Sequence, residues 1–492
     1  MARINTNISS QIAQFNLART NSDLSLRLQR LATGLRINRG ADDPAGLIVS
    51  ERLRSELNGL GQAISNSERA SSVIATTEGY LAEVADLLNS VKALVVEAAN
   101  TGGISQEEIQ ANQLQIDSAI ESITRISNTA SFAGLQLLNG SLEYLTSGLP
   151  TSAIANVDLF AVQFGNATSV NVAVEVISSA QTASLFLSGN TAGAAGELLS
   201  SVTLEIAGNF GVQTLSFVSG TNLSAVVAAV NTLKDSTGVS AALVDAADQT
   251  SGLTFNSIGY GSDEFVSVRK IGQGGDFFSV ALAQSGAVAN RDTGRDVSAI
   301  INGALAVGNG LNISLNNPSL SLQMNLTPTY AQTTGVVRSF SITGGGAKFQ
   351  LGPTINATQQ IGFGVQSVAA SRLGATIIGG VEYFLDSLRS GNSNALIAGQ
   401  AENAAKILDS AITDVSVLRG RLGAFERNTL QTNINSLQIG LENITASESK
   451  IRDADFAAET AALSRAQILS QAGTVVLATA NASAQSVLGL LG

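Results

Sequence analysis

The chain has 492 residues, enough for two to four domains of ordinary size, and it contains no Cys, His or Trp. These absences exclude disulfides, thiol nucleophiles, Cys or His metal sites and every catalytic triad that needs an imidazole. Only 13% of the residues are charged and 4% are aromatic, whereas 44% are hydrophobic. The apolar content is therefore mostly aliphatic, which favours long packed helices and thin sheets.

The charge is negative overall and unevenly distributed along the chain. The net charge of −11 argues against nucleic acid as a partner, because phosphate binding needs a basic face. Residues 1–40 hold six Arg and one Asp, whereas residues 187–337 hold five basic and ten acidic groups. We therefore expect the N-terminal segment and the middle of the chain to lie in different surroundings.

Neither end of the sequence predicts a membrane segment. The first residues are polar where the apolar stretch of a signal peptide should run, so we expect export without a cleavable signal peptide. Residues 466–492 carry no formal charge and are long enough to cross a bilayer, but nine of them are polar. We expect no membrane span there, and instead a helix that packs against protein.

The N-terminal segment has the apolar spacing of a coiled-coil seam. Leucines recur every seven residues, with others at the alternating spacing of three and four. This stripe consists of Ile4, Ile8, Ile12, Phe15, Leu17, Leu24, Leu28, Leu31 and Leu35. Gly34 and Gly40 interrupt it, and Asp43 followed by Pro44 predicts an N-cap with proline at the first helical position.

A second stripe predicts a continuous helix over 45–100, a rod of roughly 80 Å. Its apolar positions include Leu53, Leu57, Leu60, Ile64, Leu81, Leu88 and Val95. Thr101–Gly103 ends it, and Ser105 is expected to cap a third helix. A comparable stripe near the C-terminus includes Leu408, Val415, Leu422, Leu437 and Leu441. The two ends therefore predict one helical bundle, formed by segments far apart in sequence.

Between these helices the apolar period changes from three-and-four to two. Residues 170–176 and 320–326 alternate as half-buried strands do. Residues 200–270 predict strand, strand, helix, strand, strand, and the Gly344–Gly346 run predicts a hairpin turn between 340–342 and 349–351. The predicted fold class is α+β: a long antiparallel helical bundle or coiled coil made by both chain ends, with an inserted β-rich region and a small α+β outer domain.

No catalytic, cofactor or metal constellation stands out in the sequence. Asp42 and Asp43 are adjacent carboxylates, but one is expected to cap a helix and the other to lie near Arg39. We therefore expect no enzyme activity and no cofactor. The last predicted helix combines small residues with large apolar ones, which suits packing between subunits. Its large apolar residues are Ile468, Leu469, Val476, Leu477, Val487, Leu488, Leu490 and Leu491.

Four motifs together resemble bacterial flagellin. They are RINTN, LATGLRINRGADDPAGLIVSERLRSELNGLGQAISN, TTEGYLAEV and SRAQILSQAGTVVLATANASAQSVLGLL. The resemblance covers about 1–140 and 400–492, in the expected order. It implies a non-enzymatic, extracellular subunit of the flagellar filament. It also implies a filament core from 1–40 with 451–492, a helical rod with β-hairpins from 41–186 with 338–450, and a variable outer α+β domain over 187–337.

The same resemblance implies partners. The chain is expected to polymerise with itself through the two terminal stripes, from Ile4 to Leu35 and from Ile468 to Leu491, while the stripes of the rod pack within it. An export apparatus, an export chaperone on Ala458–Leu491, a filament cap and hook-junction proteins are the other implied partners. The alternative reading is a hook-filament junction protein of the same family. An adhesin or lectin role for the outer domain stays open, but a metallopeptidase insert would need histidines that the chain lacks.

Overall fold

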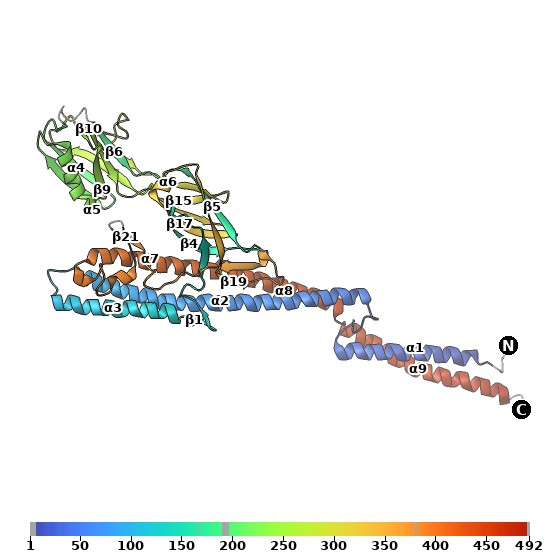
Figure 1. Cartoon of the computed structure of the whole chain (residues 1–492). Helices are drawn as coiled ribbons and strands as arrows, with labels where there is room; N and C mark the ends of the chain where they lie inside the picture. The colour runs from blue at the N-terminus through green and yellow to red at the C-terminus, as the bar shows by residue number, and fades with distance from the viewer. Residues whose placement is uncertain (1–5, 166, 189–195, 379–380, 490–492) are drawn as a thin grey trace. The chain divides into compact units, whose positions relative to one another are not determined.

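The computed structural model describes residues 6–165, 167–188, 196–378 and 381–489, with side chains as far as residue 483. The described residues form two compact units. The first joins the two ends of the chain and comprises those within Met1–Ser72, Gln350–Ile355 and Ala424–Gly492. The second comprises those within Val73–Phe349 and Asn356–Gly423. Helices come from both chain ends and strands from the middle, which confirms the predicted α+β class (Figure 1).

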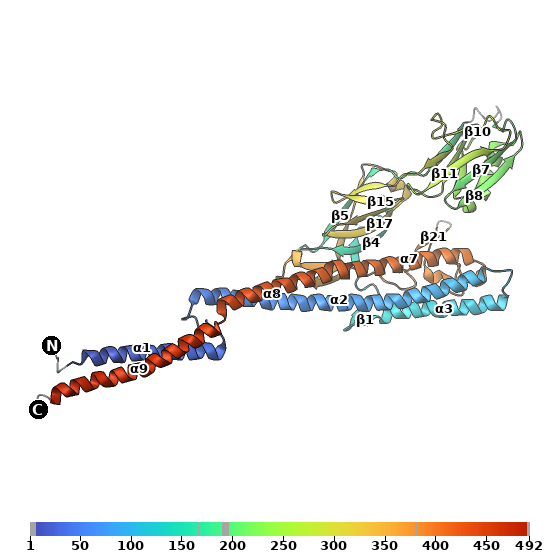
Figure 2. The same ribbon diagram turned by 180° about the vertical axis from the view of Figure 1, so that it is seen from behind.

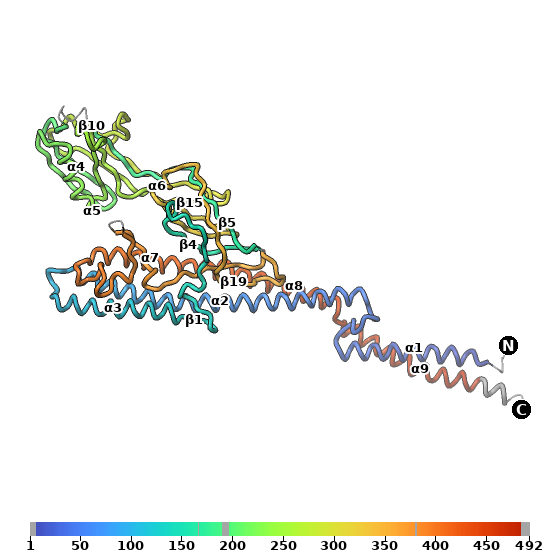
Figure 3. Tube along the Cα trace, viewed as in Figure 1, coloured from blue at the N-terminus to red at the C-terminus, as the bar shows by residue number. Residues whose placement is uncertain are grey.

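The first unit contains helix α1 (Ile8–Thr33), which begins and ends with clear capping interactions. The side chain of Asn7 accepts a hydrogen bond from the Ser10 amide at 3.1 Å. The helix ends at Gly34, whose φ of 71° lies in the left-handed region that favours glycine. The predicted interruption at Gly34 is therefore confirmed. Helix α9 (Phe456–Gly489) runs antiparallel to α1, as the Cα trace in Figure 3 shows.

Helix α2 (Pro44–Ala98) is one continuous element of 55 residues. Asp43 Oδ1 accepts a hydrogen bond from the Gly46 amide at 2.9 Å, which confirms the predicted N-cap. Asp42 accepts the amides of Asn38 and Arg39 and lies 3.8 Å from the Arg39 guanidinium. Helix α3 (Gln106–Thr129) starts with the predicted Ser105 cap, which forms a reciprocal capping box with Glu108. The adjacent aspartates thus have structural roles.

The C-terminal stripe of the rod forms three successive helical segments: α7 (Ala401–Phe425), the π-helix η5 (Glu426–Gln431) and α8 (Thr432–Arg452). The π-helix interrupts the α-helical pattern without ending the rod. In the second unit, α2, α3 and α7 lie side by side (Figures 1 and 2). The rod positions that are buried are Leu60, Leu81, Leu88, Val95, Leu408, Val415 and Leu422, and those that are half-buried are Leu53, Leu57, Ile64, Leu437 and Leu441.

The second unit contains an eight-stranded antiparallel sheet, in the order β3-β18-β5-β14-β15-β16-β17-β4. Its strands are β3 (Tyr144–Ser147), β4 (Ile154–Val162), β5 (Val170–Ser178), β14 (Ser298–Ile301), β15 (Ala304–Asn309), β16 (Asn312–Asn316), β17 (Leu320–Leu326) and β18 (Val337–Gly345). The alternation predicted for β5 and β17 is confirmed, since Val172, Val174, Leu322 and Met324 are buried in one hydrophobic core. The short helix α6 (Pro328–Ala331) contributes to that core.

A second hydrophobic core lies in the insert, between β5 and β14, where two four-stranded antiparallel sheets form with the orders β12-β6-β10-β9 and β13-β11-β7-β8. The strands are β6 (Ser184–Ser188), β7 (Val202–Gly208), β8 (Gly211–Phe217), β9 (Val239–Asp245), β10 (Asp248–Ser257), β11 (Phe265–Ile271), β12 (Val280–Ala281) and β13 (Arg291–Thr293). Helices α4 (Leu223–Thr232) and α5 (Lys234–Thr237) follow β8. The predicted strand, strand, helix, strand, strand order is confirmed, but its two hairpins belong to different sheets.

The predicted hairpin at Gly344–Gly346 is wrong. Strand β18 pairs with β5 and β3, whereas β19 (Ala347–Gln350) pairs with β20 (Gln360–Phe363). The glycines instead let the backbone pass close to the segment at β3. A Cβ at Gly345 would lie 2.1 Å from the Glu143 carbonyl oxygen, and one at Gly346 would lie 2.5 Å from the Tyr144 ring. Sequence pattern alone does not show this close approach.

The bounds expected for the outer domain, 187–337, match neither of the two hydrophobic cores. Strands β14–β17 and helix α6 lie inside that range but share the sheet and the core of β4, β5 and β18. The insert is shorter, because its entry and exit meet at a bridge between Gln181 and Arg295. Two further hairpins, β1 (Ser131–Phe132) with β2 (Leu135–Gln136) and β21 (Thr376–Ile378) with β22 (Val381–Tyr383), complete the described strands.

Candidate assembly interface

Helices α1 and α9 pack through small and half-buried residues. On α9 the positions that face α1 repeat every seven residues, at Glu459, Ala466, Gly473 and Ala480. A Cβ at Gly473 would lie 3.2 Å from the side chain of Leu17, so glycine permits close packing there. On α1 the opposing seam consists of Ser10, Ala13, Leu17, Leu24 and Leu31, which are buried or half-buried. The predicted leucine heptad is thus the seam of an antiparallel pair.

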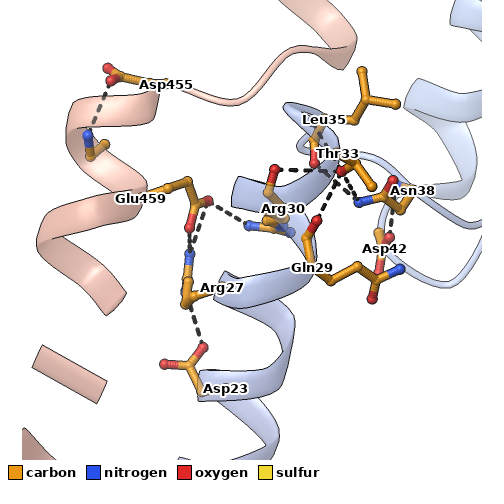
Figure 4. Close-up of polar contacts among 11 residues, drawn as sticks. Asp23, Arg27, Gln29, Arg30, Thr33, Leu35, Asn38, Asp42, Asp455 and Glu459 are labelled. Atoms are coloured by element: carbon orange, nitrogen blue, oxygen red, sulfur yellow. Dashed lines mark hydrogen bonds and ion pairs between the residues drawn. The ribbon is translucent and has the colours of Figure 1, made fainter. Parts of the chain in front are cut away.

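A charged cluster fixes one end of this pair. The Glu459 carboxylate accepts hydrogen bonds from Arg27 at 2.9 Å and from Arg30 at 3.1 Å, and Figure 4 shows both guanidinium groups pointing towards it. Burial alone would raise the pKa of Glu459, but the hydrogen bonds and charges of the two arginines outweigh burial and lower this pKa. Asp23 lies 3.2 Å from Arg27 and extends the cluster. The ionised form of Glu459 is therefore the one that joins α1 to α9.

Polar contacts set the register of the two helices along their length. At the start of α1, Asn7 Nδ2 donates to the Ala480 carbonyl at 3.0 Å. Further along, Ser470 Oγ donates to Asn21 Oδ1 at 2.8 Å. Beyond α1, the Arg36 amide donates to the Arg452 carbonyl at 2.7 Å, and the Ala454 amide donates to the Gly34 carbonyl at 2.9 Å. Asp455 caps α9 by accepting the Ala457 and Ala458 amides.

The faces of α1 and α9 that point away from each other expose large apolar side chains. Phe15 is 71% exposed and Ile468 is 66% exposed. The other exposed members are Ile8, Ile12 and Leu28 on α1, and Phe456, Leu469, Val475 and Val476 on α9. We call these nine residues the outer apolar faces. Exposed apolar surface of this extent marks an interaction site in a soluble protein.

Two family models match the chain at its ends. The model for the bacterial flagellin N-terminal helical region matches residues 4–143. The model for the bacterial flagellin C-terminal helical region matches residues 405–491. Flagellin B of Helicobacter pylori is 30% identical over 526 residues, and the alignment covers 99% of each chain. The chain belongs to the bacterial flagellin family.

As a flagellin, the chain is a structural subunit of the extracellular flagellar filament, which confirms the predicted function. The B-type flagellin of Pseudomonas aeruginosa is 29% identical, and the alignment again covers 99% of each chain. Hook-associated protein 3 of Legionella pneumophila aligns with 82% of this flagellin at 15% identity, with a TM-score of 0.30. A likeness that weak carries no conclusion on fold or function, so it gives the hook-junction alternative no support.

The predicted self-association residues of this flagellin divide into two sets. Leu17, Leu24, Leu31, Leu35 and Leu477 are half-buried. Ile8, Ile12, Phe15, Leu28, Ile468, Leu469 and Val476 belong to the outer apolar faces. Ile4, Leu490 and Leu491 lie outside the described residues, and the side chains of Val487 and Leu488 lie outside the described part of α9. Their role in polymerisation stays a prediction.

Sequence reasoning missed several members of the interface. Phe456 and Val475 are exposed on α9 but fall outside the predicted stripe. The cluster of Arg27, Arg30 and Glu459 was missed because Glu459 is more than 400 residues from the two arginines in sequence. The available signal was local: the two arginines stand three positions apart on one helix face, and Glu459 precedes a helix segment poor in charge.

A pocket of about 380 Å³ in the second unit is lined in part by titratable groups. Asp158 and Asp414 line it; Asp158 accepts a hydrogen bond from Gln366 at 2.5 Å, and Asp414 accepts the Gly374 amide at 3.1 Å. Desolvation by the surrounding protein raises the pKa of Asp414 to about 6, and the nearby charge of Asp158 adds to the rise. Among the described residues, no group of three or more potential ligands is placed to hold a metal ion.

Within the described parts of the chain, no helix combines the length and the apolar character that crossing a bilayer requires. The uncharged stretch of α9 includes Gln467, Ser470, Gln471 and Thr474, which lower its hydropathy.

Proposed function

We propose that the α1–α9 pair is the element through which copies of this flagellin polymerise. The outer apolar faces carry this proposal, because they expose Phe15 and Ile468 beside a seam that is already closed. Burying each such side chain between copies contributes about 1.5–3 kcal/mol. Contacts between different surfaces of successive copies produce an open helical filament when the rotation does not close into a ring.

The proposed layers of the filament follow from this assignment. The segments 1–40 and 451–492 form the filament core, since they hold α1, α9 and the outer apolar faces. The helices of 41–186 and 338–450 form the rod around it. The insert and its neighbouring sheet carry no part of the outer apolar faces and form the outer region. The chain acts by packing alone, without catalysis, a cofactor or nucleic acid as a partner.

The outer apolar faces also explain why further partners are needed before and during assembly. A subunit that exposes α9 in the cytoplasm is open to unwanted association, so an export chaperone covers Ala458–Leu491 until export. The chain then leaves through the flagellar export apparatus. The filament cap and the hook-junction proteins bind the two ends of the polymer, where the α1–α9 pairs have no neighbour of the same kind.

The insert is proposed to be dispensable for polymerisation. Its two ends lie together, because the Gln181 amide donates to the Arg295 carbonyl at 2.8 Å and the Arg295 amide donates back at 3.0 Å. Its core is closed by residues between Ala183 and Val280. A short turn can therefore replace residues 182–294 without breaking the eight-stranded sheet.

Removal of Ala466–Gly492 tests the proposed function. We expect the truncated chain to keep a folded second unit, measured by thermal unfolding, and to form no filaments, measured by sedimentation and electron microscopy. The chain in which a short turn replaces 182–294 is the control, because it loses more residues yet is expected to polymerise. Normal filaments from the truncated chain would contradict the assignment to α1 and α9.

A further inference from the structure

Four asparagines form a row across four neighbouring strands of the eight-stranded sheet. The row consists of Asn309 on β15, Asn312 on β16, Asn325 on β17 and Asn156 on β4, and each is paired in register with the next. Figure 1 shows β15, β17 and β4 in this order. Neighbouring strands lie about 4.8 Å apart, so the row is about 14 Å long. We call these residues the asparagine row.

The asparagine row lies on the face of the sheet that points away from its hydrophobic core. Side chains alternate between the two faces along a strand, and on β17 the residue next to Asn325 is Met324, which is buried in the core. Asn156, Asn309 and Asn312 are exposed, and Asn325 is half-buried. The amide groups of the row are therefore accessible from one side of the sheet.

A second row runs beside the first on the same face, two positions along each strand. Its members, which are also paired in register with one another, are Val307, Ser314, Gln323 and Asp158. Val307 is the one apolar residue of the two rows, and Asp158 carries their one formal charge. We call the eight residues of the two rows the polar strip.

The polar strip begins in the pocket of about 380 Å³, a size that suits a small ligand. Asn156 and Asp158 line this pocket, and so do Gln366, Asp414 and Phe384. The pocket therefore combines carboxylates, amides and an aromatic ring. Because β4 contributes Asn156 and Asp158 to both features, the pocket and the strip share one polar surface within the second unit.

The stability of the sheet does not account for the asparagine row. Asparagine is depleted in strands, where β-branched and aromatic residues pack better. Asparagines stacked across strands can stabilise a sheet by bonding to one another. The side chains of Asn309, Asn312 and Asn325, however, form no hydrogen bond to any residue that the structure describes. Each of these amides therefore keeps its donors and its acceptor available for a ligand.

The groups on this surface match a neutral carbohydrate. A side-chain amide both donates and accepts hydrogen bonds, as a sugar hydroxyl does. An anionic ligand needs cations, but the polar strip has none, and four carboxylates line the pocket beside one arginine. A protein partner needs an apolar centre, and Val307 alone does not provide one. A small cation would occupy the pocket and leave the asparagine row unused.

We propose that the pocket and the polar strip bind a neutral oligosaccharide. One sugar unit occupies the pocket, where Gln366 holds Asp158 through a hydrogen bond of 2.5 Å and Phe384 supplies an aromatic surface. The following units lie along the asparagine row, whose amides bond to their hydroxyls. Arg421 holds Gln323 of the strip by donating to its Oε1 at 3.2 Å. This binding is additional to packing through α1 and α9 and does not depend on the proposed function.

Saturation-transfer difference NMR of the full-length chain with soluble oligosaccharides tests the proposal, because this method detects weak binding. The probes are neutral cello-, malto-, chito- and manno-oligosaccharides from disaccharide to hexasaccharide, with oligogalacturonates as anionic counterparts and spermidine as a cation. We expect at least one neutral series to bind, with an affinity that rises as the chain reaches the asparagine row. Oligogalacturonates should bind at least about tenfold more weakly, because the carboxylates of the pocket repel them.

A double variant shows whether the asparagine row takes part. Asn312→Ala with Asn325→Ala removes two amides, so it should lower the affinity for the longer oligosaccharides about tenfold and leave disaccharide binding in the pocket unchanged. The control is Asn89→Ala with Asn290→Ala, at two exposed positions outside the strip, which should change neither affinity. Circular dichroism checks that each variant is folded. Equal affinities in the two double variants, or a response to spermidine and to no neutral sugar, would overturn the proposal.

Discussion

The α1–α9 pair and the insert bury their apolar residues in opposite ways. In the insert, Phe255, Leu253 and Val268 are fully buried in a core that two sheets and α4 close. In the terminal pair, α1 buries only Ser10 and Ala13 among its described residues, whereas its larger apolar residues Ile12 and Phe15 are exposed. The insert is complete within one chain, whereas the proposed function requires the terminal pair to pack against neighbouring copies. The same aliphatic composition thus serves a closed core in one region and an open interface in the other.

The largest expected effect comes from placing polar groups on the outer apolar faces. Phe15→Ser combined with Ile468→Ser should raise the critical concentration for polymerisation at least about tenfold, because two large apolar side chains no longer become buried. Light scattering during assembly measures this. Leu305→Ser is the matched control, since Leu305 is equally exposed but lies on β15. Equal effects from both variants would show that general hydrophobicity, and not this interface, drives assembly.

For a variant in the core of the insert, we expect a loss of stability without a loss of polymerisation. Phe255→Ala should destabilise the insert by about 3–5 kcal/mol, because it leaves a cavity in a closed core. Thermal unfolding and limited proteolysis measure the loss, and filaments should still form at low temperature. Leu199→Ala, at an exposed position, should change stability by less than about 0.5 kcal/mol. Loss of filament formation at temperatures where the insert remains folded would show that the two regions are coupled.

Glu459→Gln tests the charged cluster that joins α1 to α9. We expect a loss of about 2–3 kcal/mol in the stability of the pair, because Arg27 and Arg30 lose a charged acceptor. Since the folded pKa of Glu459 is lowered, its stabilising effect is present above the ordinary glutamate pKa of 4.5 and is lost as the pH falls through the lowered value. Helix content followed by circular dichroism between pH 3 and 7 shows this loss.

The variant Glu459→Gln should lack this acid-dependent step, which is the loss of helix content as the pH falls through the lowered pKa. Glu56→Gln, at an exposed glutamate of α2, is the control and should retain it. A step of unchanged size in Glu459→Gln would mean that other carboxylates cause the acid sensitivity of the pair.

The smallest expected effect belongs to Asp414 in the pocket of the second unit. Its folded pKa is raised to about 6, so its contribution to stability is greatest below the ordinary aspartate pKa and is lost as the pH rises through 6. Asp414→Asn should remove this pH dependence and stabilise the unit at pH 7. The gain should not exceed about 1 kcal/mol, because the Asp414 side chain is exposed and solvent screens its charge. Urea unfolding at pH 5 and 7 measures it, with Asp263→Asn as an exposed control; equal pH dependence in the two variants would contradict the assignment.

Features set by neighbouring residues could be predicted from the sequence. The caps at Asp43 and Ser105, the end of α1 at Gly34 and the alternation of β5 and β17 all follow from residues within one or two turns. These elements form because local hydrogen bonds and apolar periodicity act over short distances. The α+β class and the family resemblance followed from the same local patterns.

The tertiary structure alone decided which residues meet across long sequence separations. It placed Leu17 in a seam and Phe15 outside it, although both belong to one apolar stripe. It also brought Glu459 to Arg27, and it separated the β7–β8 and β9–β10 hairpins into different sheets. A periodic pattern defines a face of a helix or strand, but the partner of that face depends on packing between distant segments. The sequence therefore determined the elements and their apolar faces, and the three-dimensional arrangement decided which of those faces stay open.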